Sequence, residues 1–256
     1  MVVCLGKEKV GVIKMIRIKN VSFTYPDGNK ALSNISLEIK EGSTVAIVGA
    51  NGAGKSTLLN LLVGIHQTKE GEIEIANIPL CKDRLDEIRR GVGFVFQNPD
   101  DQLFMARVYD DIAFGPKNFG YSVSQVEEMV SSAIKTLKIE HLKDRAPHKL
   151  SGGEKRNVAL AAVLSMDPEI LLLDEPTSFL DPKSRRNLIN ILGSLKHTKI
   201  IATHDLDLVL DLCERVIILK NGEIFADGKP RQLFNNPEAM EQCGMEIPLS
   251  MQYSMQ

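Results

Sequence analysis

The stretch from residue 44 to residue 63 constrains the fold of this chain more than any other part of the sequence. Residues 44–48 read TVAIV, a continuous apolar run that is typical of a strand buried on both faces of a parallel sheet. Residues 49–57 follow as GANGAGKST, and a helical pattern occupies 55–63. A strand, a loop of the form G-x-x-x-x-G-K-[ST] and a helix, in this order, predict a loop whose backbone N–H groups surround a phosphate.

The residue types in this loop suit that chemistry. Glycines let the backbone turn its N–H groups inward around an anion, and the positive end of the helix dipole adds to the attraction. Lys55 would supply a point charge for the β- and γ-phosphates, and Ser56 would supply a hydroxyl ligand for Mg²⁺. The predicted phosphate-binding set is Gly49, Ala50, Asn51, Gly52, Ala53, Gly54, Lys55, Ser56 and Thr57.

The rest of the pattern predicts an α/β core with two additions. Continuous apolar runs predict further parallel strands at 170–173 and 199–203, each followed by a helix, at 184–196 and 205–212. Alternating polar and apolar residues predict a partly exposed antiparallel sheet from the segments 16–25, 35–40 and 71–76. Helical patterns without strands predict a helical subdomain inserted at about 100–167, with helices at 108–114, 124–138 and 153–166.

Three segments are expected along the chain. Residues 1–14 read as a disordered extension before Met15, residues 15–235 as the folded domain, and residues 236–256 as a polar tail. Within the domain, residues 215–227 predict a hairpin that turns at Asn221 and Gly222, and a short helix is expected at 230–235. The tail methionines are expected to be frayed rather than metal-binding; they are Met245, Met251 and Met255.

Composition excludes several classes of protein. The 256 residues carry 31 Lys and Arg against 33 Asp and Glu, and the net charge of −2 argues against a nucleic-acid binder with a basic face. The longest stretches without Asp, Glu, Lys or Arg, 42–54 and 56–68, are far shorter than the about 20 apolar residues of a membrane-spanning helix. The widely spaced cysteines indicate reduced thiols rather than a disulfide framework or a zinc cluster; they are Cys4, Cys81, Cys213 and Cys243.

Two further segments carry chemistry. Residues 170–175 read ILLLDE, so Asp174 and Glu175 would lie at the carboxyl edge of the sheet, where open α/β sheets bind ligands. There Asp174 would hold Mg²⁺ through water, and Glu175 would orient or activate an attacking water. Residues 150–154 read LSGGE and open a helix, which is either an ordinary serine N-cap or a second anion-binding helix end. Two chains associated head-to-tail could each offer this segment to the phosphate held by the other.

In their order along residues 16–235, these motifs resemble those of the ATP-binding subunit of an ABC transporter. The resemblance implies a P-loop NTPase (RecA-like) core with an antiparallel β subdomain and an inserted α-helical subdomain. It implies ATP and Mg²⁺ as ligands, and Tyr25 as the ring that stacks on adenine. The catalytic residues that it implies are Lys55, Gln97, Glu175 and His204, and the implied Mg²⁺ ligands are Ser56, Gln97 and Asp174.

Two more motifs of this family would act between paired chains. The signature motif, whose Ser151 and Gly153 would contact the γ-phosphate held by the other chain, comprises Ser151, Gly152, Gly153 and Glu154. Residues 178–181, SFLD, match the D-loop, in which Asp181 would couple the two sites. Glu154 stands where the family usually has Gln and is expected to point along its helix rather than at the phosphate. Phe179 stands where a small residue is common and could alter the packing between the chains.

The region after Gln97 resembles the energy-coupling-factor group of importers. QNPDDQLF (97–104) and VYDDIAFGPKNFG (108–120) carry this likeness. It implies import of cobalt, another transition metal or a vitamin, and a peripheral position on the cytoplasmic face of the membrane. The implied partners are a second ATPase subunit, identical or related, a transmembrane coupling subunit and a substrate-binding membrane protein, with no nucleic acid. The groove for the coupling helices would be lined by Asp100, Asp101, Gln102 and Phe104.

Two alternatives stay open at the level of the sequence. One is the ATPase subunit of an ordinary ABC transporter outside the coupling-factor group. The other is a soluble ABC ATPase that acts on macromolecules such as ribosomes or DNA, although such proteins usually carry two cassettes or a long coiled coil.

Overall fold

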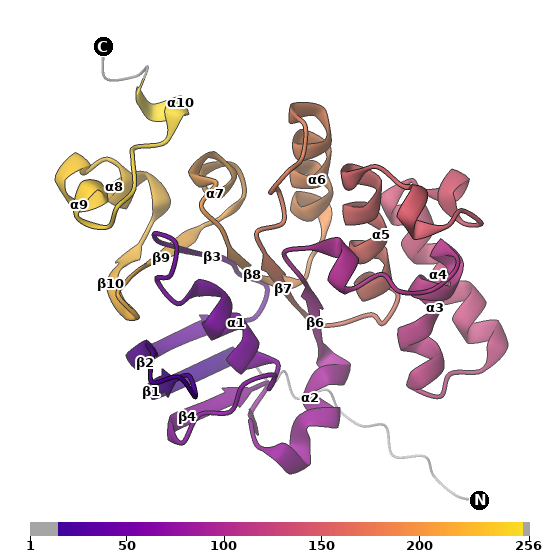
Figure 1. Cartoon of the computed structure of the whole chain (residues 1–256), viewed down its shortest axis with the longest axis horizontal. Helices are drawn as coiled ribbons and strands as arrows, with labels where there is room; N and C mark the ends of the chain where they lie inside the picture. Colours follow the sequence, from indigo (N-terminus) through magenta and orange to yellow (C-terminus); the bar gives the residue numbers. More distant parts are fainter. Residues whose placement is uncertain (1–14, 253–256) are drawn as a thin grey trace, which may run out of the picture.

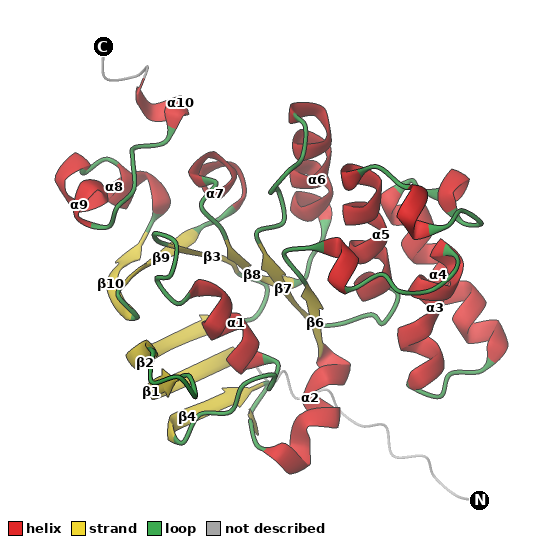
Figure 2. Ribbon diagram, in the orientation of Figure 1, coloured by secondary structure: helices red, strands yellow, loops and turns green. Residues whose placement is uncertain are grey.

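The computed structural model describes residues 15–252 of the chain. The predicted extension at 1–14 and the last tail methionine, Met255, therefore lie outside the described residues. The described part contains two β-sheets and a separate group of helices, which forms the right-hand side of Figure 1. Figure 2 shows helices and strands intermixed around the larger sheet, and an almost purely helical region at one side.

The larger sheet has six strands in the order β10-β9-β3-β8-β7-β6. Five of them are parallel, namely β3 (Thr44–Val48), β6 (Val92–Val95), β7 (Ile170–Asp174), β8 (Thr198–Ala202) and β9 (Arg215–Lys220). The edge strand β10 (Glu223–Gly228) runs antiparallel to β9. The predicted hairpin is confirmed, because Asn221 and Gly222 have φ values of 50° and 78°, as a tight two-residue turn requires.

The smaller sheet is antiparallel and has the order β2-β1-β4-β5. Its strands are β1 (Met15–Thr24), β2 (Lys30–Lys40), β4 (Glu70–Ile75) and β5 (Ile78–Pro79). Along β2 the side chains of Ile35, Leu37 and Ile39 are buried while those between them are exposed. The alternation in the sequence therefore reflects one face packed on the core and one face in water.

Helices cover the larger sheet and continue into the helical region. Those of the core are α1 (Lys55–Leu62), α2 (Leu85–Gly91), α6 (Pro182–Ser194), α7 (Leu206–Leu212) and α8 (Pro230–Phe234). The helical region between β6 and β7 contains α3 (Val108–Asn118), α4 (Val123–Leu137) and α5 (Gly152–Leu164). Asp181 caps α6, and Pro182 fits its first turn, so this helix starts two residues before the predicted start. Between residues 15 and 252, no helix is long and apolar enough to cross a membrane.

Two apolar clusters lie on opposite faces of the six-stranded sheet. Val45 and Ile47 of β3 pack in the cluster with α1 and the antiparallel sheet. Ala46 and Val48, the alternate residues, pack in the cluster with the helical region, α6 and α7. A strand that is covered on both faces needs apolar residues at every position, which explains the continuous runs in the sequence. The carboxyl ends of β3, β7 and β8 meet at one edge, where the chemical motifs gather.

The C-terminal segment differs from the frayed tail that the sequence suggested. It forms α9 (Pro237–Gln242) and α10 (Leu249–Gln252). Met240 is fully buried, and Met245 and Met251 pack against the core. Asn236 caps α9 by accepting a hydrogen bond from the Ala239 N–H, and this helix carries its methionine into the core. The prediction of a frayed tail is therefore wrong for residues 237–252.

Candidate active site

The glycine-rich loop leaves the carboxyl end of β3 and enters α1. A Cβ atom at Gly49 would lie 2.3 Å from the carbonyl oxygen of Leu219, in the neighbouring strand β9. Gly54 has a φ of 103°, and a Cβ there would lie 2.7 Å from the carbonyl oxygen of Ala31. Only glycine fits either position without a backbone shift, so the neighbouring strands hold the loop in this shape.

Lys55 lies inside this loop. Its side chain is buried, and its Nζ donates hydrogen bonds to the carbonyl oxygens of Gly49 at 2.8 Å and Ala50 at 3.1 Å. Burial lowers the pKa of the Lys55 ammonium, and the negative charges of Glu175 and Asp174 oppose this shift. A cation that has lost much of its hydration gains strongly from a nearby anion, which suits the predicted contact with phosphate.

Asp174 ends β7 directly behind the loop. The Ser56 hydroxyl at the start of α1 lies close enough to the Asp174 carboxylate to lower its pKa. Burial raises the pKa of Asp174, while the Ser56 hydroxyl opposes the shift. Its Oδ1 atom is buried and has no hydrogen-bond partner within residues 15–252. A hydroxyl beside an unpartnered carboxylate oxygen is the type of ligand set that Mg²⁺ prefers, so these two residues fit the predicted metal.

Glu175 and His204 lie in contact, as expected for two groups of one site. The Glu175 carboxylate is buried, and its Oε2 lies 2.8 Å from His204 Nδ1. The same oxygen accepts hydrogen bonds from the Thr203 hydroxyl at 3.1 Å and from the His204 N–H at 3.3 Å. Glu175 has a φ of 45°, a left-handed conformation that is uncommon outside glycine and clusters at functional sites. The backbone between β7 and α6 thus turns the carboxylate toward the end of β8.

Gln97 joins this group through its backbone. Its side chain is exposed, and its role as a Mg²⁺ ligand stays a prediction. The backbone carbonyl of Gln97 accepts a 2.6 Å hydrogen bond from Arg156 Nη2, and that of Phe96 accepts one of the same length from Nη1. The segment 96–102 that contains Gln97, called the Q-loop below, is therefore attached to α5.

Arg156 also belongs to this group, although it is not among the site residues predicted from the sequence. It is only 2 % exposed, and its charge also faces Asp174. Its helix carries Leu160 and Val163 on the same buried face, at the i+4 and i+7 positions. A charge on an otherwise apolar stripe is the signal in the sequence that could have identified this buried polar contact.

The signature segment begins α5 with a capping box. The Ser151 hydroxyl accepts a hydrogen bond from the Glu154 N–H at 3.3 Å, and Glu154 Oε2 accepts one from the Ser151 N–H at 2.8 Å. The hydrogen bond from the Ser151 N–H lowers the pKa of Glu154, and the Ser151 hydroxyl and the charge of Arg145 add to the effect. The Glu154 carboxylate therefore lies along the first turn of its helix, bonded to the Ser151 N–H. Gly152 and Gly153 form the first turn.

Two other predicted residues make local contacts. Asp181 accepts hydrogen bonds from the Lys183 and Ser184 N–H groups and from the Ser184 hydroxyl, so in a single chain it is the cap of α6. The Tyr25 hydroxyl lies 3.0 Å from the Thr57 hydroxyl, which places its partly exposed ring beside the loop helix. The ring is held edge-on against Phe23, with 5.0 Å between centroids.

The predicted groove wall is divided between structural and exposed residues. Gln102 donates to the Ala159 carbonyl at 2.8 Å, and Asp100 pairs with Lys155 at 2.6 Å, so both attach this turn to α5. Asp101 accepts a hydrogen bond from Asn98 and is exposed. Phe104 is 64 % exposed and lies edge-on to Phe114, with 4.9 Å between ring centroids. Asp101 and Phe104 therefore stay available to a partner, and Phe114, which was not predicted, lies beside Phe104.

At one sheet edge the structure thus assembles the parts that phosphoryl transfer needs. The loop N–H groups and Lys55 can hold phosphates, and Ser56 with Asp174 can hold a metal ion. The carboxylate of Glu175 can accept a proton from water or orient it, and His204 lies beside it. Such chemistry depends on positioning and charge stabilisation rather than on a covalent intermediate.

Comparison with known proteins agrees with this reading. Residues 32–178 match the sequence family described as ABC transporter. Over 239 residues the chain is 43 % identical to the energy-coupling factor transporter ATP-binding protein EcfA of Methanothermobacter thermautotrophicus, covering 91 % of this chain and 77 % of that one. The structure of this chain is similar to that of cbiO1 from Clostridium perfringens, described as part of the ABC transporter complex cbiONQ. The TM-score is 0.80 and the identity 38 %, and the match covers 90 % of this chain and 94 % of that one. The structure is also similar to that of the ATP-binding cassette MJ0796, solved as a dimer bound to ADP and Pi, with a TM-score of 0.77, 34 % identity and coverage of 84 % and 99 %.

Proposed function

This chain belongs to the ABC transporter family, and we propose that it is the ATP-hydrolysing subunit of an importer of the energy-coupling-factor type. Family membership makes it an ATP hydrolase whose activity is coupled to transport. The observation that carries the finer proposal is its likeness to EcfA and to cbiO1 over most of its length. The contact between Glu175 and His204 behind the phosphate-binding loop supports an intact catalytic site.

In the proposed reaction, the chain binds ATP with the loop 49–57 around the phosphates. The loop N–H groups and the Lys55 ammonium neutralise the phosphate charge, and the Tyr25 ring stacks on adenine. Ser56 and Asp174, with Gln97 completing the set, would hold Mg²⁺, which neutralises charge that develops on the phosphate oxygens. Glu175 orients a water molecule and accepts its proton, and His204 steadies the γ-phosphate.

Two chains would share each site. Ser151 and Gly153 begin α5 at an exposed helix end, where N–H groups can meet the γ-phosphate of ATP bound to the other chain. Gly152 and Glu154 shape that end, and Asp181 would couple the two sites. The dimeric structure described for the similar cassette MJ0796 supports this arrangement.

The membrane partner would dock beside the Q-loop, at the cytoplasmic face. Phe104 and Phe114 form an exposed aromatic pair there, next to the turn 97–102 that is attached to α5. An exposed aromatic pair is typical of a protein contact site. The partners proposed are a transmembrane coupling subunit and a substrate-binding membrane protein, and the cargo is cobalt, another transition metal or a vitamin.

Co-expression with membrane proteins encoded beside the gene tests the assignment. We expect the tagged chain to co-purify with them in detergent, and ATP hydrolysis to rise when the complex is placed in liposomes. Phe104→Asp should abolish co-purification, whereas Val123→Asp, at another exposed apolar residue, should not. Co-purification with nucleic acid or ribosomes instead would favour the soluble ABC ATPase. Uptake of radioactive cobalt, nickel or a labelled vitamin by those liposomes would identify the cargo.

A further inference from the structure

Phe179 is in an unfavourable position in a single chain. Its side chain is 94 % exposed, the highest value among the large apolar residues that the structure describes. Its φ is 62°, in the left-handed region that bulky side chains rarely adopt. Exposure of one apolar side chain is common on protein surfaces, but exposure together with backbone strain indicates that the residue contacts another molecule.

Phe179 lies between the signature segment and the end of β8. The next residue, Leu180, lies within 3.9 Å of where a Cβ on Gly153 would be, so Phe179 is anchored beside the start of α5. On its other side, Phe179 and His204 line the same shallow cleft. This face therefore carries the signature segment, Phe179 and the catalytic site.

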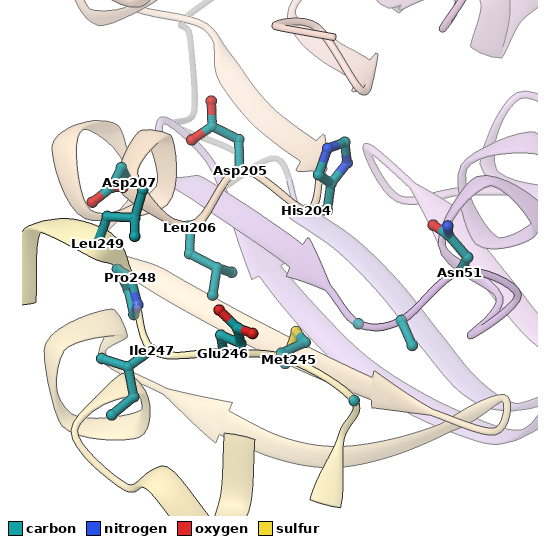
Figure 3. Close-up of a pocket in the computed structure, with 13 residues that line it drawn as sticks. Asn51, His204, Asp205, Leu206, Asp207, Met245, Glu246, Ile247, Pro248 and Leu249 are labelled. Carbon is teal, nitrogen blue, oxygen red and sulfur yellow. The ribbon is translucent and has the colours of Figure 1, made fainter. Parts of the chain in front are cut away.

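A cavity of about 490 Å³ opens on this same face, beside the phosphate-binding loop. Its walls are the loop at 49–51, the segment from His204 to Asp207, and the C-terminal segment 244–249. In Figure 3 the side chain of Leu206 points from α7 toward the C-terminal segment. The apolar part of the wall comprises Leu206, Met245, Ile247, Pro248 and Leu249. Cavities of about 300–1,000 Å³ take up small molecules, so this one has room for an aromatic side chain.

We propose that Phe179 of one copy of this chain docks into this cavity on a second copy. The inference rests on the proposed function, in which each chain places its signature segment over the phosphate-binding loop of the other. Because Phe179 is anchored beside Gly153, that placement brings it toward the partner's loop and the cavity next to it. A two-fold dimer makes the contact twice, since each copy carries both the aromatic side chain and the cavity.

The contact accounts for both unfavourable features of Phe179. Burial of the ring against the apolar part of the wall, from Leu206 and the segment 245–249, removes its exposed surface from water and offsets the strain of its backbone. The remainder of the wall is polar and carries the side chains of Asn51, His204, Asp205, Asp207 and Glu246. The C-terminal segment that completes the cavity is itself fastened, because the Ser250 N–H and hydroxyl both bond to Asp207 of α7. The cavity therefore binds a second copy of this chain, which carries Phe179, more tightly than it binds a related ATPase with a small residue at this position.

Dimer formation by Glu175→Gln variants in ATP and Mg²⁺ tests the proposal, measured by light scattering over a range of protein concentrations. We expect Phe179→Ala and Phe179→Gly to raise the dissociation constant of the dimer about 10- to 100-fold. Phe179→Gly should also leave the melting temperature of the nucleotide-free monomer unchanged or higher, because glycine relieves the strain. Val123→Ala, at a residue that is 79 % exposed, is the matched control and should change neither quantity.

Two outcomes separate this inference from the proposed function. If the Glu175→Gln parent forms no ATP-dependent dimer, the pairing of two copies is itself overturned. If the parent dimerises and both Phe179 variants dimerise equally well, only the docking of Phe179 is wrong.

Disulfide trapping locates the contact directly. In a background with Cys4→Ser and Cys81→Ser, the pair Phe179→Cys and Ile247→Cys should form a crosslinked dimer with copper phenanthroline and ATP. The pair Val123→Cys and Ile247→Cys should stay monomeric. A crosslink within one chain, or none, would place Phe179 elsewhere.

Discussion

Replacement of Arg156 by Met tests how α5 is joined to the catalytic site. The guanidinium of Arg156 is buried, and its two terminal nitrogens each lie 2.6 Å from a carbonyl oxygen, those of Phe96 and Gln97. Methionine fills a similar space without donors or charge. The variant therefore leaves two partly buried carbonyl acceptors unpaired, and it removes a cation that, like Lys55, faces Asp174.

The expected loss of stability is large. An acceptor left unsatisfied costs about 1–3 kcal/mol, and Arg156 serves two of them. We therefore expect the free energy of unfolding to fall by about 3–5 kcal/mol. For a domain of this size, each 1 kcal/mol lowers the melting temperature by about 2–4 °C, which gives a decrease of roughly 6–20 °C.

Calorimetry and ATPase kinetics measured well below the melting temperature give the two readouts. Because Arg156 holds the backbone of Gln97 rather than the phosphate loop, kcat should fall at least about tenfold while KM for ATP changes little. Arg156→Lys should lie between the parent and Arg156→Met, because one ammonium cannot hold two carbonyls in fixed geometry.

Lys155→Met is the matched control for Arg156→Met. Lys155 pairs with Asp100, whose side chain is 60 % exposed, so the loss should stay below about 1 kcal/mol. The reasoning is refuted if Arg156→Met loses no more stability than Lys155→Met, or if its kcat equals that of the parent.

Three further predictions concern the catalytic site. Lys55→Ala should weaken ATP binding at least about 100-fold in calorimetric titration, because it removes the buried cation of the loop; near-normal binding would contradict its role. Glu175→Gln should bind ATP normally but hydrolyse it about 10²–10⁴-fold more slowly in a phosphate-release assay; full turnover would assign the base elsewhere. Burial raises the pKa of Asp174 in the folded chain, so its charge costs stability as pH rises through that pKa. Asp174→Asn should therefore gain more free energy of unfolding over the parent at pH 7 than at pH 4, as measured by urea unfolding. An equal gain at both pH values would contradict this.

The catalytic motifs were predictable because each is local in the sequence. The loop 49–57 needs its glycines, a preceding buried strand and a following helix, and all three are contiguous in the chain. The same holds for Asp174 and Glu175 at the end of β7. Since parallel strands end at the same sheet edge, the meeting of these segments followed from the fold class.

Features that depend on distant partners were not predictable in this way. Strand β6 was missed because it has four residues and contains Gly93, where a Cβ would lie 2.2 Å from Val163 of α5. That glycine weakens the strand pattern locally, yet it lets the helical region pack against the sheet. The helices of the C-terminal segment were missed because Met240 is a single apolar residue in a polar stretch of sequence. Only the folded structure shows that this residue is buried in the core.

Helix α5 links three predicted sites rigidly to one another: the signature segment, the segment 96–102 and Phe104. Ser151 starts the helix, and Arg156, five residues later and so about 7.5 Å along its axis, holds the carbonyls of Phe96 and Gln97. One turn further, the Ala159 carbonyl accepts the side chain of Gln102, two residues before the exposed Phe104. A displacement of the signature end must therefore move the Q-loop and the aromatic pair with it, unless these hydrogen bonds break. Since the signature end would meet ATP on the other chain and the aromatic pair would meet the membrane subunit, α5 and Arg156 provide the mechanical connection that the proposed function requires.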